Sequence, residues 1–256
     1  MNINEVLASM DAGETAFPAG WAQGRAGFGG LVAAMMFRAL EKQIIDRPVR
    51  ALSISFVAPV QAGPISLPVE VFRQGGSVTQ AQCRLEQGGQ VLAVMLASFG
   101  KARESSIHVE PVARPSISSP EQGMALPEVP GLTPEFVRHF DFRWCEGPYP
   151  YTAGDQGLIA GWVRFREPMG HSVAHLLALV DAWPPAVIGL FSKPAPSSSL
   201  TWNIEFIGES NKPADWWQYR ADTDYAANGY AFTEARLWHE DGSLIAISRQ
   251  TVAAFG

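Results

Sequence analysis

The longest apolar run in the chain, residues 172–186, carries a single acidic side chain, Asp181. The run predicts a core-facing helix, and at 3.6 residues per turn Asp181 shares a face with Ala174, Leu177 and Ala178. A carboxylate on a buried face is costly unless it has hydrogen-bond partners or a function. The alternative is that Asp181 only ends the helix, or caps a short turn that leads into Pro184 and Pro185.

A second helix is predicted over 31–41, where good helix formers are apolar on most faces. A short strand-like segment at 14–24 and the run Gly27-Phe-Gly-Gly30 precede it. Glycines at a helix start let another group approach the first free backbone N–H donors, although they can equally serve tight packing alone. The helix has no carboxylate before Glu41, at its far end, where we expect solvent.

Alternating or β-branched residues predict strands in the rest of both halves. They lie at 49–60, 65–74, 78–87 and 90–99, and then at 136–144, 158–166, 199–207, 216–224, 230–239 and 244–253. Glycine-rich breaks between several of them are typical of hairpin turns. Residues 104–134 contain six prolines and predict an extended linker.

The order of a helix followed by antiparallel strands occurs twice, about 150 residues apart. Local sequence supports the repeat, since Arg84-Leu85 precedes Gly89-Gln-Val-Leu-Ala-Val94 as Arg236-Leu237 precedes Gly242-Ser-Leu-Ile-Ala-Ile247. We therefore predict an α+β chain with two related units, 1–103 and 135–256, joined by the linker 104–134. The second unit carries the candidate catalytic residues.

Composition narrows the classes of partner. The 256 residues are 47% hydrophobic with a net charge of −6 and no dense basic run, which argues against nucleic acid and against an anionic membrane surface. Cys83 and Cys145 form no CxxC pair, so neither a metal site nor a disulfide framework is indicated. The N-terminus lacks a signal-peptide pattern, and we expect a cytoplasmic protein. His175, Asp181 and the prolines favour a buried helix over a membrane span at 172–191.

Several motifs, taken in order, resemble those of the bacterial acyl-CoA thioesterase II family. They are Phe28-Gly-Gly30, Ser55-Phe-Val-Ala-Pro59, Arg73-Gln-Gly-Gly-Ser77, Ala97-Ser-Phe99 and Gly161-Trp-Val-Arg-Phe-Arg166. Each motif is short, but together they cover most of the chain outside 104–134. The resemblance implies a double hotdog fold, in which each of two units wraps an antiparallel sheet around a helix.

The resemblance also implies a hydrolytic site. The family pairs an Asp on the second helix with a hydroxyl residue and a Gln on later strands, and these correspond to Asp181, Ser199 and Gln250. Ser53 stands where some members have a His, so no role of that His carries over. By analogy with hotdog enzymes, the backbone N–H groups of Gly29 and Gly30 are candidates to polarise the thioester carbonyl. Acyl-CoA is the implied substrate, with no cofactor and no metal.

The residue types suit thioester hydrolysis, which needs an activated water and a stabilised oxyanion. A carboxylate can take the proton of the water, while a Gln amide and a Ser hydroxyl hold both groups in place. Each residue alone also has a structural explanation. A regular strand would put Ser199 on a solvated face with Thr201, Asn203 and Glu205, and Gln250 on a half-buried face with Ala246, Ser248 and Val252.

We therefore predict an acyl-CoA thioesterase that forms a homodimer or larger homo-oligomer. Two alternatives stay open: a non-catalytic protein that binds acyl thioesters, and a hotdog enoyl-CoA hydratase or dehydratase. No Asp is followed by His five residues later, the pattern typical of hotdog hydratases. Cationic candidates for the phosphates of coenzyme A are Lys101, Arg103, Arg143, Arg164, Arg166 and Lys193. Because the position that matches Gln250 in the first half is Ala97, we expect one site per chain, built from both halves.

Overall fold

The computed structural model describes residues 1–167, 170–208 and 211–254. Within them one antiparallel sheet of 11 strands has the order β6-β7-β8-β4-β12-β15-β14-β13-β11-β10-β9. The first half supplies β4 (Val49–Phe56), β6 (Val69–Gln74), β7 (Val78–Gln87) and β8 (Gln90–Gly100). The second half supplies β9 (Met124–Ala125), β10 (Phe140–Glu146), β11 (Leu158–Phe165), β12 (Ser197–Phe206), β13 (Trp217–Ala227), β14 (Tyr230–His239) and β15 (Leu244–Ala254).

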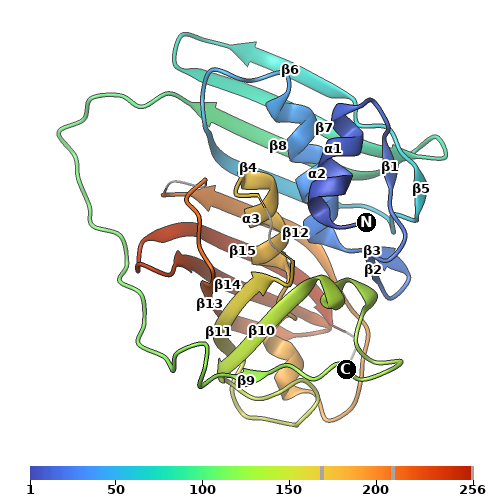
Figure 1. Cartoon of the computed structure of the whole chain (residues 1–256), viewed down its shortest axis with the longest axis vertical. Helices are drawn as coiled ribbons and strands as arrows, with labels where there is room; N and C mark the ends of the chain where they lie inside the picture. Colours follow the sequence, from blue (N-terminus) through green and yellow to red (C-terminus); the bar gives the residue numbers. More distant parts are fainter. Residues whose placement is uncertain (168–169, 209–210, 255–256) are drawn as a thin grey trace.

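The two halves join through β4 and β12, which pair antiparallel with Ser53 opposite Asn203. Two helices, α2 (Gly29–Glu41) and α3 (Val173–Asp181), pack against each other on one side of this sheet (Figure 1). A Cβ on Gly30 would lie only 3.0 Å from the Cα of Ala178, so the glycine lets the two backbones approach closely. The start of α2 and the end of α3 therefore lie near the seam between the halves.

The apolar run that begins at Ser172 is divided in two. Helix α3 ends at Asp181, and after Pro184 and Pro185 the chain forms a 3-10 helix, η2 (Ala186–Leu190). The stretch Val173–Leu190 is long and apolar enough to cross a membrane, but 72% of it is buried inside the structure. Such burial is typical of a core helix.

The N-terminal helix α1 (Ile3–Asp11) was not predicted. Asn2 and Glu5 form a capping box at its start, and its apolar side chains face the core. The strand expected at 14–24 is instead a loop with two short strands, β1 (Ala16–Phe17) and β2 (Ala22–Gln23), which pair with β5 (Gly63–Pro64) and β3 (Ala26–Gly27). Glu41, expected in solvent, is half-buried and pairs with Arg38.

Prolines explain where predicted strands are too long. β4 ends before Pro59, and β6 begins directly after Pro68. Pro134 starts a 3-10 helix, η1 (Glu135–His139), so β10 begins at Phe140 instead of 136. Proline has no N–H to donate to a ladder and restricts the residue before it, so each proline stops regular pairing.

The linker is anchored to the outer face of the sheet in the second half. Trp238, Gln218 and Trp162 donate side-chain hydrogen bonds to the carbonyl oxygens of Val112, Pro115 and Ser118, at 3.2, 2.8 and 2.8 Å. In Figure 1 the preceding part of the linker arcs away from the body of the molecule. The boundaries 1–103, 104–134 and 135–256 stay a prediction.

The two halves repeat their strand register, including the positions of the bulges. β4 has a bulge at Arg50 between the pairs Val49↔Phe99 and Ala51↔Ser98. β12 has one at Leu200, between Ser199↔Val252 and Thr201↔Thr251. β6 and β13 also carry bulges at matching places. Each residue of the second half can therefore be matched to a counterpart in the first half by ladder position.

Candidate active site

Ser199 does not lie on the solvated face that a regular strand predicts. The bulge at Leu200 inserts one extra residue, which shifts the alternation of side chains on its N-terminal side. Leu200 and Thr201 are both exposed, whereas Ser199 is half-buried and lies opposite the buried Val252. The bulge therefore turns the Ser199 hydroxyl to the inner face of the sheet, where the helices pack.

On this inner face Ser199, Gln250 and Asp181 form a chain of hydrogen bonds. The hydroxyl of Ser199 donates to Oε1 of Gln250 at 3.0 Å, and Nε2 of Gln250 donates to Oδ1 of Asp181 at 2.7 Å. The amide oxygen and nitrogen can be told apart, because the oxygen accepts from a hydroxyl while the nitrogen faces a carboxylate. The three residues predicted from the sequence are thus brought together from β12, β15 and the end of α3.

The carboxyl group of Asp181 faces the first turn of α2. The backbone N–H of Gly30 donates to it, and a Cβ on Gly29 would lie 2.8 Å from Oδ2. Burial raises the pKa of Asp181 from 3.8 to about 7, although the hydrogen bonds from Gln250 and Gly30 oppose the rise. A carboxyl group with a pKa near 7 can accept a proton and return it at neutral pH.

Two aromatic residues near Asp181 were not predicted. Trp183 follows on the same chain segment and stacks on Tyr219 of β13, with ring centroids 5.4 Å apart. Burial raises the pKa of Tyr219, and the charge of Asp181 raises it further, so the two side chains share one electrostatic environment. The sequence could have suggested Trp183, which lies two residues from Asp181. It could not have suggested Tyr219, which comes near Asp181 only through the pairing of strands.

The first half has no equivalent of this site. By ladder position Val49 matches Ser199, and Ala97, which faces Leu52 as Gln250 faces Trp202, matches Gln250. Both counterparts are buried and apolar. What the first half contributes is the start of α2, whose backbone donors need no side chain.

A groove of about 1090 Å³ opens beside the three residues. Its walls include Ala182 and Trp183, which follow Asp181, and Ser197 and Ser198, which precede Ser199. The rest of its lining is rich in proline and aromatic residues, and Arg25 and Glu135 are its only charged members among the described residues. The groove thus suits a largely apolar ligand. None of the cations proposed from the sequence for coenzyme A phosphates lines it.

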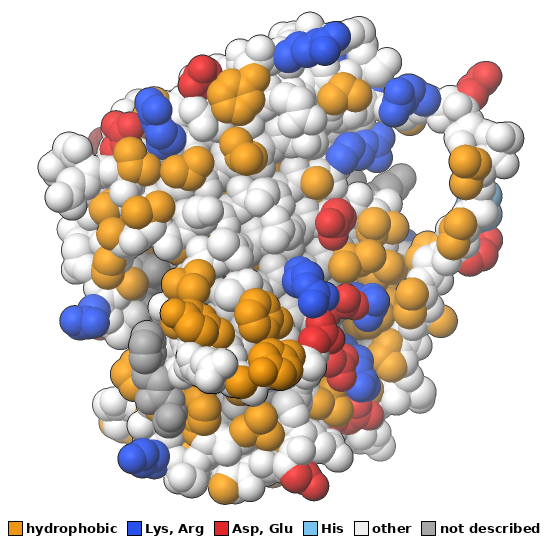
Figure 2. Space-filling model, turned by 180° about the vertical axis from the view of Figure 1, so that it is seen from behind, with side chains coloured by type: hydrophobic (Ala, Val, Ile, Leu, Met, Phe, Trp, Pro, Cys, Tyr) orange, Lys and Arg blue, Asp and Glu red, His pale blue; other side chains and the backbone are white. Residues whose placement is uncertain are grey.

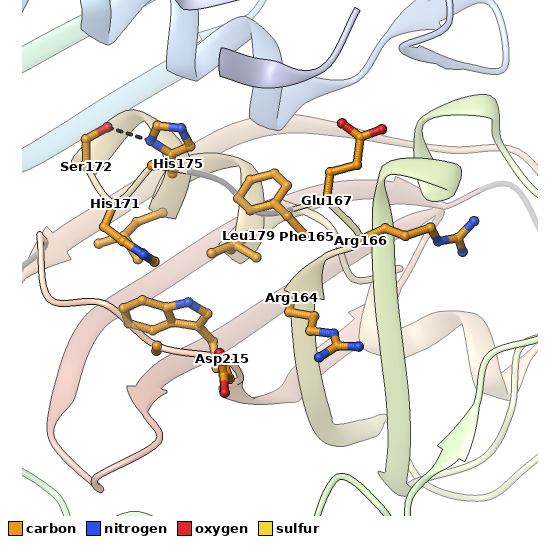
Figure 3. A pocket seen from close by; sticks show the side chains of 13 residues that line it. Arg164, Phe165, Arg166, Glu167, His171, Ser172, His175, Leu179 and Asp215 are labelled. Atoms are coloured by element: carbon orange, nitrogen blue, oxygen red, sulfur yellow. Dashed lines mark hydrogen bonds between the residues drawn. The ribbon is translucent and has the colours of Figure 1, made fainter. Parts of the chain in front are cut away.

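A smaller cavity of about 300 Å³ lies at the other end of α3, beside Ser172 and His175 (Figure 3). Its two arginines, Arg164 and Arg166, both pair with Asp141. Nε2 of His175 donates to Oδ1 of Asn4 at 2.8 Å, and Ser172 donates to Nδ1 at the same distance. Burial lowers the pKa of His175 to about 4, so the ring is neutral and ties α1 to α3. Its lining includes Ser172 and His175 at the start of α3, whereas Asp181 ends the helix and does not line it.

Fold and site together define a class of protein: a double hotdog with one hydrogen-bonded Asp–Gln–Ser group at the junction of its halves. Residues 17–100 match the model of the acyl-CoA thioesterase N-terminal domain, and residues 120–254 match that of the acyl-CoA thioesterase C-terminal domain. The chain therefore belongs to the acyl-CoA thioesterase family, and as a member it is a thioester hydrolase. The predicted family and fold class are confirmed.

Solved structures share this fold. A hot dog protein of unknown function from Alicyclobacillus acidocaldarius superposes with a TM-score of 0.83 at 24% identity, covering 94% of this chain and 92% of that one. A putative thioesterase II from Thermobifida fusca gives 0.80 at 18%, with 96% and 97% covered. The acyl-CoA thioesterase II of Mycobacterium marinum gives 0.73 at 21%, with 90% of each chain covered. No curated protein matches the sequence.

Proposed function

We propose that this chain hydrolyses acyl-CoA thioesters with Asp181 as the general base, positioned by Gln250 and Ser199. The observation that carries the proposal is the hydrogen-bonded chain from Ser199 through Gln250 to a carboxyl group whose pKa is about 7. A structural pair on a sheet would not require a carboxylate to be buried at this cost. The first turn of α2 adds backbone donors on the opposite side of the same carboxyl group.

The chemistry proceeds in two proton transfers. The ionised Asp181 takes a proton from water, whose oxygen attacks the carbonyl carbon of the thioester. The negative charge then moves to the carbonyl oxygen. The N–H of Gly30 donates to Asp181, so of the two glycine amides expected from the sequence we propose that of Gly29 as the donor that stabilises this oxygen. When the carbon–sulfur bond breaks, protonated Asp181 returns the proton to the leaving thiolate. The products are a carboxylic acid and free coenzyme A.

The groove is the proposed site of the acyl chain. Its apolar lining begins at Trp183 and Ser198, each one or two residues from a member of the site, so a thioester carbon near Asp181 would direct its acyl chain into it. At about 1090 Å³ it is large enough for a long or branched acyl group. The phosphates of coenzyme A are expected outside the groove, because Arg25 is its only cation within the described residues.

The test is release of free thiol from a panel of acyl-CoA esters that differ in chain length. We expect hydrolysis by the wild-type protein, loss of at least about 100-fold in kcat on Asp181→Asn, and one active site per chain by titration. Binding of acyl-CoA without thiol release would favour a non-catalytic binder. Addition of water to an enoyl-CoA, without thiol release, would favour a hydratase. Two equivalent sites per chain would refute a site built from both halves.

A further inference from the structure

A row of polar side chains continues from Gln250 across the inner face of the sheet. Thr233 of β14 lies directly opposite Gln250, and Thr223 of β13 lies directly opposite Thr233. Thr233 is 6% exposed. The hydroxyl oxygens of both threonines are buried, and neither has a hydrogen-bond partner among the residues that the structure describes.

The duplicated half provides an internal comparison. There the same row reads Ala97, Ala81 and Val71, in the same ladder positions and beside the matching bulge, in β6 instead of β13. The row is therefore apolar where Gln250 is missing and polar where Gln250 is present. A hydrophobic core at this level of the sheet does not need the hydroxyl of Thr233, since the first half has the buried Ala81 there. The occurrence of the two hydroxyls beside Gln250 points to the site.

Buried hydroxyls are almost always hydrogen-bonded, either to protein or to ordered water. Cross-strand neighbours have Cβ atoms about 5 Å apart, and the hydroxyls of Thr223 and Thr233 do not bond each other, so a bridging water suits them. The Gln250 amide has one N–H to spare, because only one of its two donors is needed for Asp181. Two hydroxyls and one amide N–H supply three partners, the usual number for a buried water.

We propose that Thr233 is a positioning residue for thioester hydrolysis: with Thr223 it holds a buried water against the spare N–H of Gln250, and this water keeps the amide nitrogen turned toward Asp181. The inference rests on the proposed function of Asp181 and Gln250. It adds the residues that orient the Gln250 amide, which in turn positions Asp181. If the amide rotated, its oxygen would face the carboxylate, and the Ser199 hydroxyl would lose its acceptor.

The decisive comparison is Thr233→Val against Thr233→Ser. Valine keeps the shape without the hydroxyl, and serine keeps the hydroxyl. We expect Thr233→Val to lower kcat about fivefold, the scale of one lost hydrogen bond, with KM unchanged, and Thr233→Ser to restore most of the loss. Thr79→Val is the matched control, because Thr79 also has a buried hydroxyl without a described partner but lies in β7 of the first half. It should leave kcat unchanged.

Two further readouts test whether Thr233 acts through Gln250. Because the Gln250 hydrogen bond lowers the pKa of Asp181, Thr233→Val should move the acidic limb of the kcat/KM profile to higher pH by about half a unit. In a Gln250→Ala background, Thr233→Val should cause no further loss. The proposal would be overturned if Thr233→Val and Gln250→Ala lowered kcat additively. It would also be overturned if Thr233→Ser and Thr79→Val lowered kcat as much as Thr233→Val does.

A measurement independent of turnover separates this inference from the proposed function. NMR titration of protein labelled with ¹³C at aspartate Cγ follows Asp181 directly, with Asp181→Asn for assignment. A higher midpoint in Thr233→Val than in wild type supports the positioning role even if no acyl-CoA is hydrolysed. An unchanged midpoint in a protein that hydrolyses acyl-CoA refutes the positioning role and leaves the proposed function intact.

Discussion

Replacing Asp181 with asparagine separates the charge of this side chain from its shape. Burial raises the pKa of Asp181 from 3.8 to about 7, so the folded state holds the proton more tightly than the unfolded chain does. The folded state therefore loses stability as pH rises between these two values, and the full penalty is present above pH 7. Below pH 3.8 the carboxyl group is protonated in both states and imposes no penalty.

The size of this effect follows from the shift. One pKa unit corresponds to about 1.4 kcal/mol, which sets an upper limit of about 4 kcal/mol for the penalty at pH 8. Partial solvent access at the end of α3 reduces the expectation to about 2–3 kcal/mol. Asparagine can still accept from Gln250, but its NH₂ group faces the Gly30 N–H, which costs about 1 kcal/mol at every pH.

We therefore expect the stability difference between Asp181→Asn and wild type to change sign with pH. The variant should be about 0.5–1 kcal/mol less stable near pH 4 and about 1–2 kcal/mol more stable at pH 8, a Tm increase of a few degrees for a chain of this length. Urea unfolding at intervals from pH 4 to pH 8 measures the difference. Asp155→Asn, in the exposed loop between β10 and β11, is the control and should parallel wild type.

Activity supplies the second half of the test. The kcat/KM of wild type should rise with pH through about 7 and then level off, as Asp181 ionises. The asparagine variant should lose at least about 100-fold in kcat while it stays folded. Parallel curves of stability against pH for the variant and wild type would refute the raised pKa of the buried Asp181. Wild-type turnover by the variant would refute the assignment of Asp181 as the base.

Three further outcomes are expected. Gly29→Ala should lower kcat at least about tenfold, because the new Cβ would lie 2.8 Å from Oδ2 of Asp181. A change at Gly30 is a less specific test, since its Cβ would meet the backbone of α3. A fully active Gly29→Ala variant would contradict the prediction. Ser199→Ala should lower kcat about fivefold through loss of the hydrogen bond to Gln250. Ser53→Ala is the control and should leave kcat unchanged, because Ser53 lies on the outer face beside Asn203. Equal effects of the two changes would argue against a role of Ser199. The chain should form at least a homodimer, because large hydrophobic side chains are exposed, among them Leu200, Tyr225, Tyr230 and Phe232. Figure 2 shows hydrophobic side chains gathered on the reverse side of the molecule. Light scattering that finds only a 27.7 kDa species at micromolar concentration would contradict this prediction.

Periodicity and turn residues predicted most of the architecture. The limits of β7 and β14 match the predicted strands, and both central helices lie where apolar runs placed them. These elements are long and strongly patterned, so local sequence determines them. The predicted strands that ran too far did so where proline interrupts pairing, as at Pro59 and Pro68. The missed helix α1 also had a local signal, the capping box of Asn2 and Glu5.

The geometry of the site depended on what local sequence does not encode. The bulge at Leu200 reverses the face of Ser199, and no residue in Ser197-Ser-Ser-Leu-Thr201 marks which position is inserted. Gln250 was placed on the correct face because β15 is regular through that position. Tyr219 and Thr233 reach the site only by pairing of strands distant in sequence. Such residues become visible when the register of the sheet is known.

Comparison of the two repeated halves explains how one site can be built from both of them. A hotdog unit buries the inner face of its sheet against its helix, and at the level of Gln250 the first half does so with Leu52, Ala97 and Ala81. The second half places Gln250 and Thr233 at the matching positions, where each polar group must find a partner. Gln250 finds its partners in Ser199 and in Asp181 at the end of α3, and Asp181 faces the opening turn of α2 across the seam. The first half can therefore keep an apolar row, because its contribution to the site is backbone that any sequence with glycine at 29 and 30 can offer.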